Sequence, residues 1–105
     1  MITTAGNTVF FAPIAAGTIG RNEIVPPTPG KSIVVLHYTM VSKGTVNVEF
    51  QSGDRTLTGD MYLVVNSGAS ASSTNGLFAT TVGQALKLQL DANVYVGGHL
   101  TYILE

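Results

Sequence analysis

The sequence contains no cysteine and no tryptophan, and few of its residues carry a charge. Without cysteine, neither a disulfide nor a thiolate metal site can add to the stability of the core. Only 10% of the residues are Asp, Glu, Lys or Arg, against roughly 25% in an ordinary soluble domain. The net charge is −1, so little repulsion opposes association with other molecules. We therefore expect partners to cover much of the surface; a soluble domain with a neutral polar coat is the alternative.

A basic patch and a membrane-spanning run are also missing. The five basic residues are scattered along the chain and are never adjacent: Arg21, Lys31, Lys43, Arg55 and Lys87. Nucleic-acid binding needs a basic stripe, so we expect no nucleic-acid partner. The apolar run at residues 33–36 is far too short to cross a bilayer, and no signal-peptide pattern follows Met1. We expect no membrane association.

The hydrophobic residues that are present recur with a period of two. Val46, Val48 and Phe50 alternate with polar residues, and three leucines in residues 86–90 do the same. This alternation is typical of strands with one buried face, and it outweighs the helix propensity of leucine. A chain of 105 residues fits one domain. We predict that its core is built by six residues: Val46, Val48, Phe50, Leu86, Leu88 and Leu90.

About eight short strands and no amphipathic helix follow from this pattern along the chain. The predicted strands cover residues 8–12, 19–25, 31–42, 46–51, 61–65, 77–81, 86–90 and 93–96, with a continuation to about residue 104. Regularly spaced turn signals between short strands predict an all-β fold, a single antiparallel β-sandwich or jelly-roll-like domain. Within this one domain, we assign residues 1–30 to an amino-terminal arm and edge strands, and residues 31–105 to the sandwich core.

Several connections are predicted from their glycines and small residues. Lys43-Gly44 indicates a tight hairpin between the strands on either side, and residues 52–55 form the next turn. Gly97-Gly98 interrupts the last strand, which indicates a bulge or the close approach of another backbone. Residues 66–76 are small and polar and are predicted to be a loop, either a solvated connector or a contact loop that orders on binding. The amino-terminal 30 residues either reach onto a neighbouring subunit or add edge strands to their own sandwich.

Residues that could support catalysis or bind a metal are sparse. The only histidines are His37 and His99; they could meet across a sheet, but no acidic residue is spaced to supply a third metal ligand, and a structural role is favoured. The six carboxylates mostly lie near turns and chain ends, and nothing in their spacing predicts a catalytic pair: Glu23, Glu49, Asp54, Asp60, Asp91 and Glu105. We expect no enzyme, and no catalytic, cofactor-binding or metal site.

Four segments resemble small β-rich virion proteins of tailed bacteriophages. These segments are residues 46–53 (VNVEFQSG), 57–63 (LTGDMYL), 83–90 (GQALKLQL) and 94–102 (VYVGGHLTY). The similarity covers roughly residues 31–104 and is greatest to capsid decoration (cement) proteins. It lies in the pattern of strands, with no catalytic motif.

The resemblance implies a structural protein on the outer surface of the virion capsid, made in the host cytoplasm. Its expected partners are the major capsid protein and itself, as a homotrimer. The alternative is a tail- or fibre-associated sandwich that binds a cell-surface glycan. Glycan binding predicts exposed aromatic residues clustered in a groove, whereas cementing predicts a flat contact face with low charge.

Overall fold

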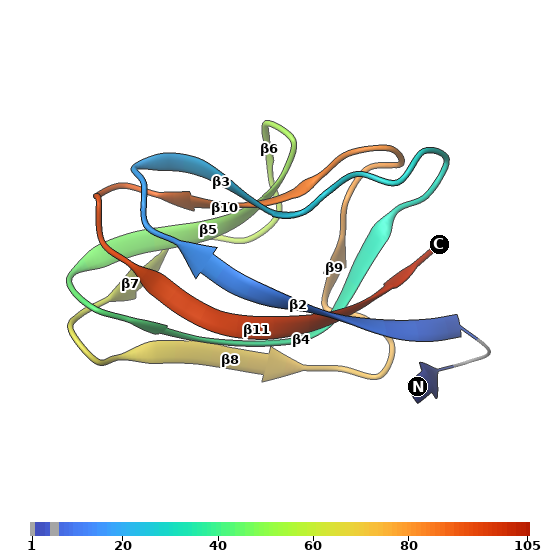
Figure 1. Cartoon of the computed structure of the whole chain (residues 1–105), viewed down its shortest axis with the longest axis horizontal. Helices are drawn as coiled ribbons and strands as arrows, with labels where there is room; N and C mark the ends of the chain where they lie inside the picture. The colour runs from blue at the N-terminus through green and yellow to red at the C-terminus, as the bar shows by residue number, and fades with distance from the viewer. Residues whose placement is uncertain (1, 5–6) are drawn as a thin grey trace.

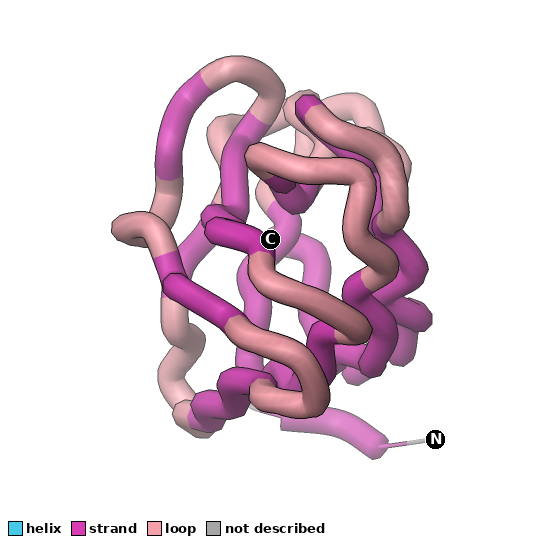
Figure 2. The backbone as a smooth tube through the Cα atoms, turned by 90° about the vertical axis from the view of Figure 1, so that its left-hand side faces the viewer, coloured by secondary structure: helices cyan, strands magenta, loops and turns pink. Residues whose placement is uncertain are grey.

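Two antiparallel sheets pack face to face in the computed structural model, which describes residues 2–4 and 7–105 (Figure 1). One sheet has the order β1-β2-β11-β4-β8, and β9 also pairs with β4. The other has the order β3-β10-β5-β6, and β7 also pairs with β5. Viewed at 90°, the described chain consists of strands and loops (Figure 2). The prediction of an all-β, antiparallel sandwich is confirmed.

The strands of the six-stranded sheet are β1 (Ile2–Thr4), β2 (Asn7–Ala16), β4 (Ile33–Ser42), β8 (Gly68–Ser72), β9 (Phe78–Ala79) and β11 (Val96–Leu104). Those of the five-stranded sheet are β3 (Gly20–Val25), β5 (Val46–Ser52), β6 (Arg55–Thr56), β7 (Met61–Leu63) and β10 (Leu86–Leu90). No helix in the described part of the chain is long and apolar enough to cross a membrane.

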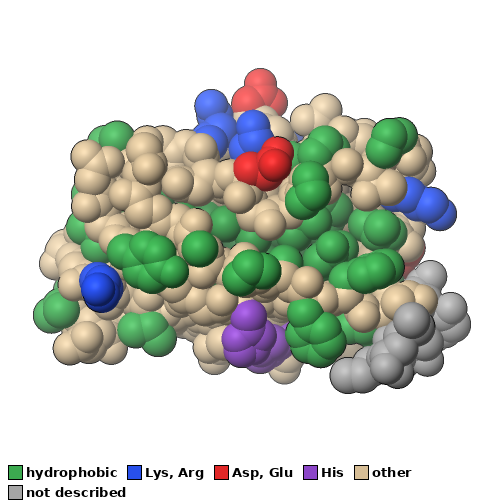
Figure 3. All heavy atoms as spheres, in the orientation of Figure 1, with side chains coloured by type: hydrophobic (Ala, Val, Ile, Leu, Met, Phe, Trp, Pro, Cys, Tyr) green, Lys and Arg blue, Asp and Glu red, His purple; other side chains and the backbone are tan. Residues whose placement is uncertain are grey.

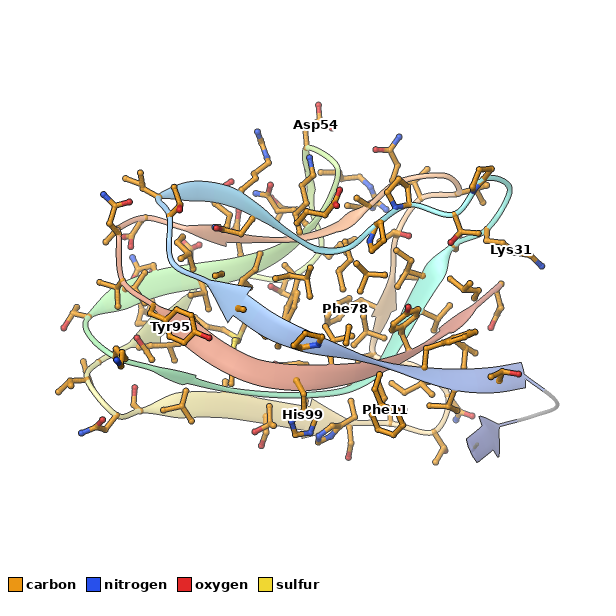
Figure 4. All side chains as sticks on the ribbon, in the orientation of Figure 1. Phe11, Lys31, Asp54, Phe78, Tyr95 and His99 are labelled. Carbon is orange, nitrogen blue, oxygen red and sulfur yellow. The ribbon has the colours of Figure 1, made fainter. Side chains whose placement is uncertain are left out.

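The core lies between the two sheets and contains all six residues predicted for it. Phe50 is at its centre, with its ring centroid 5.1 Å from those of both Tyr38 and Phe78. Figure 4 shows the Phe78 side chain in the space between the layers. The hydroxyl of Tyr38 has a partner in the sulfur of Met61 at 3.7 Å. Aromatic packing of this kind adds to the hydrophobic stabilisation of a small core.

The chain passes repeatedly from one sheet to the other, which corrects the predicted hairpin at Lys43-Gly44. β4 and β5 flank this turn but belong to different sheets, so the turn connects the two layers. The Ser42 hydroxyl accepts a hydrogen bond from the amide of Gly44 at 3.2 Å and donates one to its carbonyl. By contrast, the turn predicted at residues 52–55 does form a hairpin, with Ser52 opposite Arg55.

Two further predictions about the strands are wrong. Residues 66–76 are not all loop, because they contain β8, whose alanines Ala69 and Ala71 pack against the core. Small side chains satisfy the period-two pattern of a strand here without an obvious hydrophobic signal. Residues 93–95 lie outside any strand, and β11 begins at Val96.

The glycine pair does not interrupt the last strand, because both residues pair within β11. The other predicted reason for a glycine, a close backbone approach, is confirmed at Gly98. A Cβ there would collide with the carbonyl oxygen of Thr39 and lie 2.7 Å from the Cα of Met40. The neighbouring backbone belongs to β4 of the same sheet.

The amino-terminal residues that the structure describes are built into the sandwich. β2 lies between β1 and β11, and β3 is the edge strand that pairs with β10. Residues 7–25 thus supply strands to both sheets. Residues 1, 5 and 6 of the predicted arm lie outside the described residues.

Candidate functional site

The charged residues of this chain are confined to one of the two sheets and to the turns. Among the residues that the structure describes, no strand of the six-stranded sheet contains Asp, Glu, Lys or Arg. The charged residues in strands all lie in the five-stranded sheet: Arg21, Glu23, Glu49, Arg55 and Lys87. In Figure 3, charged side chains gather along the upper edge, where this sheet lies, and near the two ends of the molecule. The sandwich therefore has one charged layer and one uncharged layer.

The polar face of the five-stranded sheet satisfies many of its own hydrogen bonds. The Arg21 Nε donates to the Gln51 Oε1 at 2.6 Å, and the Gln51 Nε2 donates to the Glu49 Oε1 and the Gln89 Oε1, each at 2.7 Å. Gln51 is only 3% exposed. Polar groups that are already paired and hydrated gain little from a new protein contact. This face is therefore a poor candidate for the binding surface.

The carboxylates of Glu49 and Asp60 converge beside this polar network. The spacing of these residues in the sequence did not predict this pair. Partial desolvation, a hydrogen bond with Glu49 and the nearby charges of Glu49 and Asp91 raise the pKa of Asp60 above its ordinary value. Both Asp60 and Asp91 are exposed. Within the described residues, no group of three or more His, Asp or Glu side chains is placed to hold a metal ion.

The outer face of the six-stranded sheet is shaped by a β-bulge in β4. Val35 and Tyr38 both point into the core, so the two residues between them, Leu36 and His37, both point outward. The pairing with β11 shifts by one residue at this point, between Thr101 and Tyr102. A bulge places two side chains on the same face of one strand, where a regular strand would place one.

A second apolar cluster, formed by Val9, Leu36 and Ile103, lies on this outer face and is separate from the core. Val9 and Leu36 of this cluster also line a hollow of about 490 Å³. The hollow is lined by Val9, Phe11, Leu36, His37, Ser72, Ser73, Thr74 and Thr101. The Ser73 amide donates a hydrogen bond to the Leu36 carbonyl at 2.8 Å, which ties the segment after β8 to the bulge. The outer face thus has an apolar hollow with hydroxyl groups along one side.

Exposed apolar side chains extend this surface beyond the hollow. Phe11 on β2 is 64% exposed and Val41 on β4 is 53% exposed. The Tyr95 ring covers Gly97, since a Cβ on that glycine would lie 2.8 Å from the ring. Figure 4 shows Tyr95, His99 and Phe11 spaced along β11 and β2. We call this surface, the outward side of β2, β11, β4 and β8, the uncharged face.

The two histidines, which the sequence analysis allowed to meet across a sheet, do meet on the uncharged face. Their ring centroids are 5.6 Å apart and the ring planes are tilted by 39°. Neither strand alone could have revealed this contact, because His37 pairs with Thr101 and His99 with Thr39, so the histidines are diagonal neighbours. The hollow also could not be predicted from the sequence pattern, because it depends on the bulge in β4.

Comparison with protein-family models gives no match, and comparison with curated proteins gives no relative.

Proposed function

We propose that this protein is a non-enzymatic structural protein of a phage virion that decorates the outside of the head. Its uncharged face binds the major capsid protein, and three copies associate at each binding position. The observation that carries the proposal is the segregation of charge: the described strands of one sheet of the sandwich contain no Asp, Glu, Lys or Arg. Trimeric association and the capsid partner come from the resemblance.

The desolvation cost of binding supports this use of the uncharged face. Burying a charged group against a partner costs free energy unless a partner charge is placed to meet it. The uncharged face offers Phe11 and Val41 for burial, and its described strands contain no Asp, Glu, Lys or Arg to desolvate. Depletion of charge with exposed aromatic groups is the composition found at the centre of protein interfaces. β8 is an edge strand of the same sheet, so a strand of a neighbouring molecule can also pair with it.

A glycan-binding function is less well supported by the same surface. The hollow has one phenylalanine and one histidine in its lining, and its other polar groups are hydroxyls and backbone. Ring-stacking on sugars needs a cluster of exposed aromatic side chains, but the most exposed one, Tyr62, lies on β7 in the other sheet. Sugar hydroxyls are usually recognised by a few precisely placed polar side chains, and the lining contains no Asp, Glu, Asn, Gln or Arg.

Light scattering of the purified protein, followed by co-sedimentation with undecorated heads, tests the proposal. We expect the mass of a trimer and pelleting with heads that saturates at a fixed copy ratio. A glycan array with the same preparation is expected to show no specific binding. A monomer that remains in the supernatant with heads would refute the decorating role, and a specific glycan signal would favour the alternative.

A further inference from the structure

All the histidine of this chain is concentrated at one point on the uncharged face. His37 and His99 are the only histidines among 105 residues, and the chain has no cysteine. The strands that carry them, β4 and β11, are adjacent inner strands of the six-stranded sheet. Both nitrogen-donor side chains are therefore held by the part of the sheet with paired strands on both sides. No other described side chain forms a hydrogen bond with either imidazole.

The spacing of the two rings suits a shared metal ion. A metal lies about 2.0–2.1 Å from each ligating nitrogen, so two imidazoles on a tetrahedral ion have ring centres about 5 Å apart. The observed separation of the ring centroids is 5.6 Å, with the planes tilted by 39°.

We propose that His37 and His99 form a two-imidazole site for a divalent transition-metal ion such as Zn²⁺, Ni²⁺ or Cu²⁺. Imidazole nitrogen is a preferred ligand of these three ions, and it is a poor ligand for Mg²⁺ or Ca²⁺. Two protein ligands leave the remaining coordination positions open on the solvent side, where water or a donor from another molecule completes the shell. The described residues contribute no third His, Asp or Glu. The site is thus an open one.

Zn²⁺ titration of untagged protein by isothermal calorimetry tests this site. We expect one ion per chain. Because the sheet holds the second imidazole beside the first, chelation should bind the ion roughly 10²–10⁴ times more tightly than a single imidazole does. The variants His37→Ala and His99→Ala should each lose that whole factor and keep the weak affinity of one imidazole, and the double variant should lose this residual binding as well. Equal, independent weak sites in the wild type, or wild-type affinity in either single variant, would overturn the proposal.

A control on the opposite sheet separates this site from the carboxylates. Glu49→Gln disrupts the pair with Asp60 and should leave the Zn²⁺ affinity unchanged; loss of binding in this variant would assign the ion to the acidic pair. The wild type also supplies a test that needs no substitution. The ring proton resonances of both histidines should shift together at substoichiometric Zn²⁺, whereas a shift of only one ring would contradict a shared ion.

Discussion

Replacement of Phe11 by alanine should weaken attachment to heads while leaving the fold intact. Phe11 forms one wall of the hollow on the uncharged face and is 64% exposed. A phenylalanine side chain covers about 200 Å², so roughly 130 Å² of it is free to be buried by a partner. At about 25 cal/mol per Å², this area is worth about 3 kcal/mol, or a factor of roughly 100 in the dissociation constant. This is an upper value, because ordering the interface offsets part of the gain.

The assay is a saturation curve from co-sedimentation of the purified variant with undecorated heads. Tyr62→Ala is the matched control, because Tyr62 is 77% exposed on β7 of the other sheet. Both variants should keep a free energy of unfolding within about 0.5 kcal/mol of the wild type in urea, as is usual for exposed positions. If Phe11→Ala binds heads like the wild type while Tyr62→Ala binds weakly, the reasoning about the uncharged face is refuted.

Three further predictions concern the sandwich itself. Gly98→Ala should lower the free energy of unfolding in urea by about 1–3 kcal/mol or more, because the added Cβ meets the backbone of β4. Gly59→Ala, where a Cβ meets nothing within 4 Å, should lower it far less. Equal losses in the two variants would contradict this reason. Leu88→Ala should cost about 2–5 kcal/mol, because Leu88 is fully buried between the sheets; a loss under about 1 kcal/mol would contradict its place in the core. Asp60→Asn should raise the melting temperature relative to the wild type more at pH 7 than at pH 3. The pKa of Asp60 is raised in the folded protein, so the wild type loses stability as the pH rises and this carboxyl ionises beside Glu49. A difference that is the same at both pH values, or reversed, would show that this repulsion has no effect on folding.

The fold class was predictable because large side chains alternate where the sheets bury one face. The alternation in residues 46–50 and 86–90 is strong, and both segments became strands at the centre of the core. β8 was missed because alanine and serine carry little hydrophobic signal. The turn at Lys43-Gly44 was misassigned because periodicity identifies a strand but does not say to which sheet it belongs.

The candidate site was much less predictable than the fold. The low charge of the chain suggested a partner-covered surface, but the segregation of charge required the strand order, which places β2, β11, β4 and β8 in one sheet. The hollow depends on the bulge at Leu36 and His37, a backbone irregularity with no sequence signature in this chain. The approach of His37 to His99 depends on the register between two strands that are far apart in the chain.

The most direct test of the central claim is a cryo-electron microscopy reconstruction of heads saturated with the protein. We expect the outward side of β2, β11, β4 and β8 to lie against the capsid shell or against sister subunits. The charged side of β3, β10 and β5 should then face solvent. A reconstruction with the five-stranded sheet against the shell and the uncharged face open to solvent would contradict it, as would heads that carry no added density.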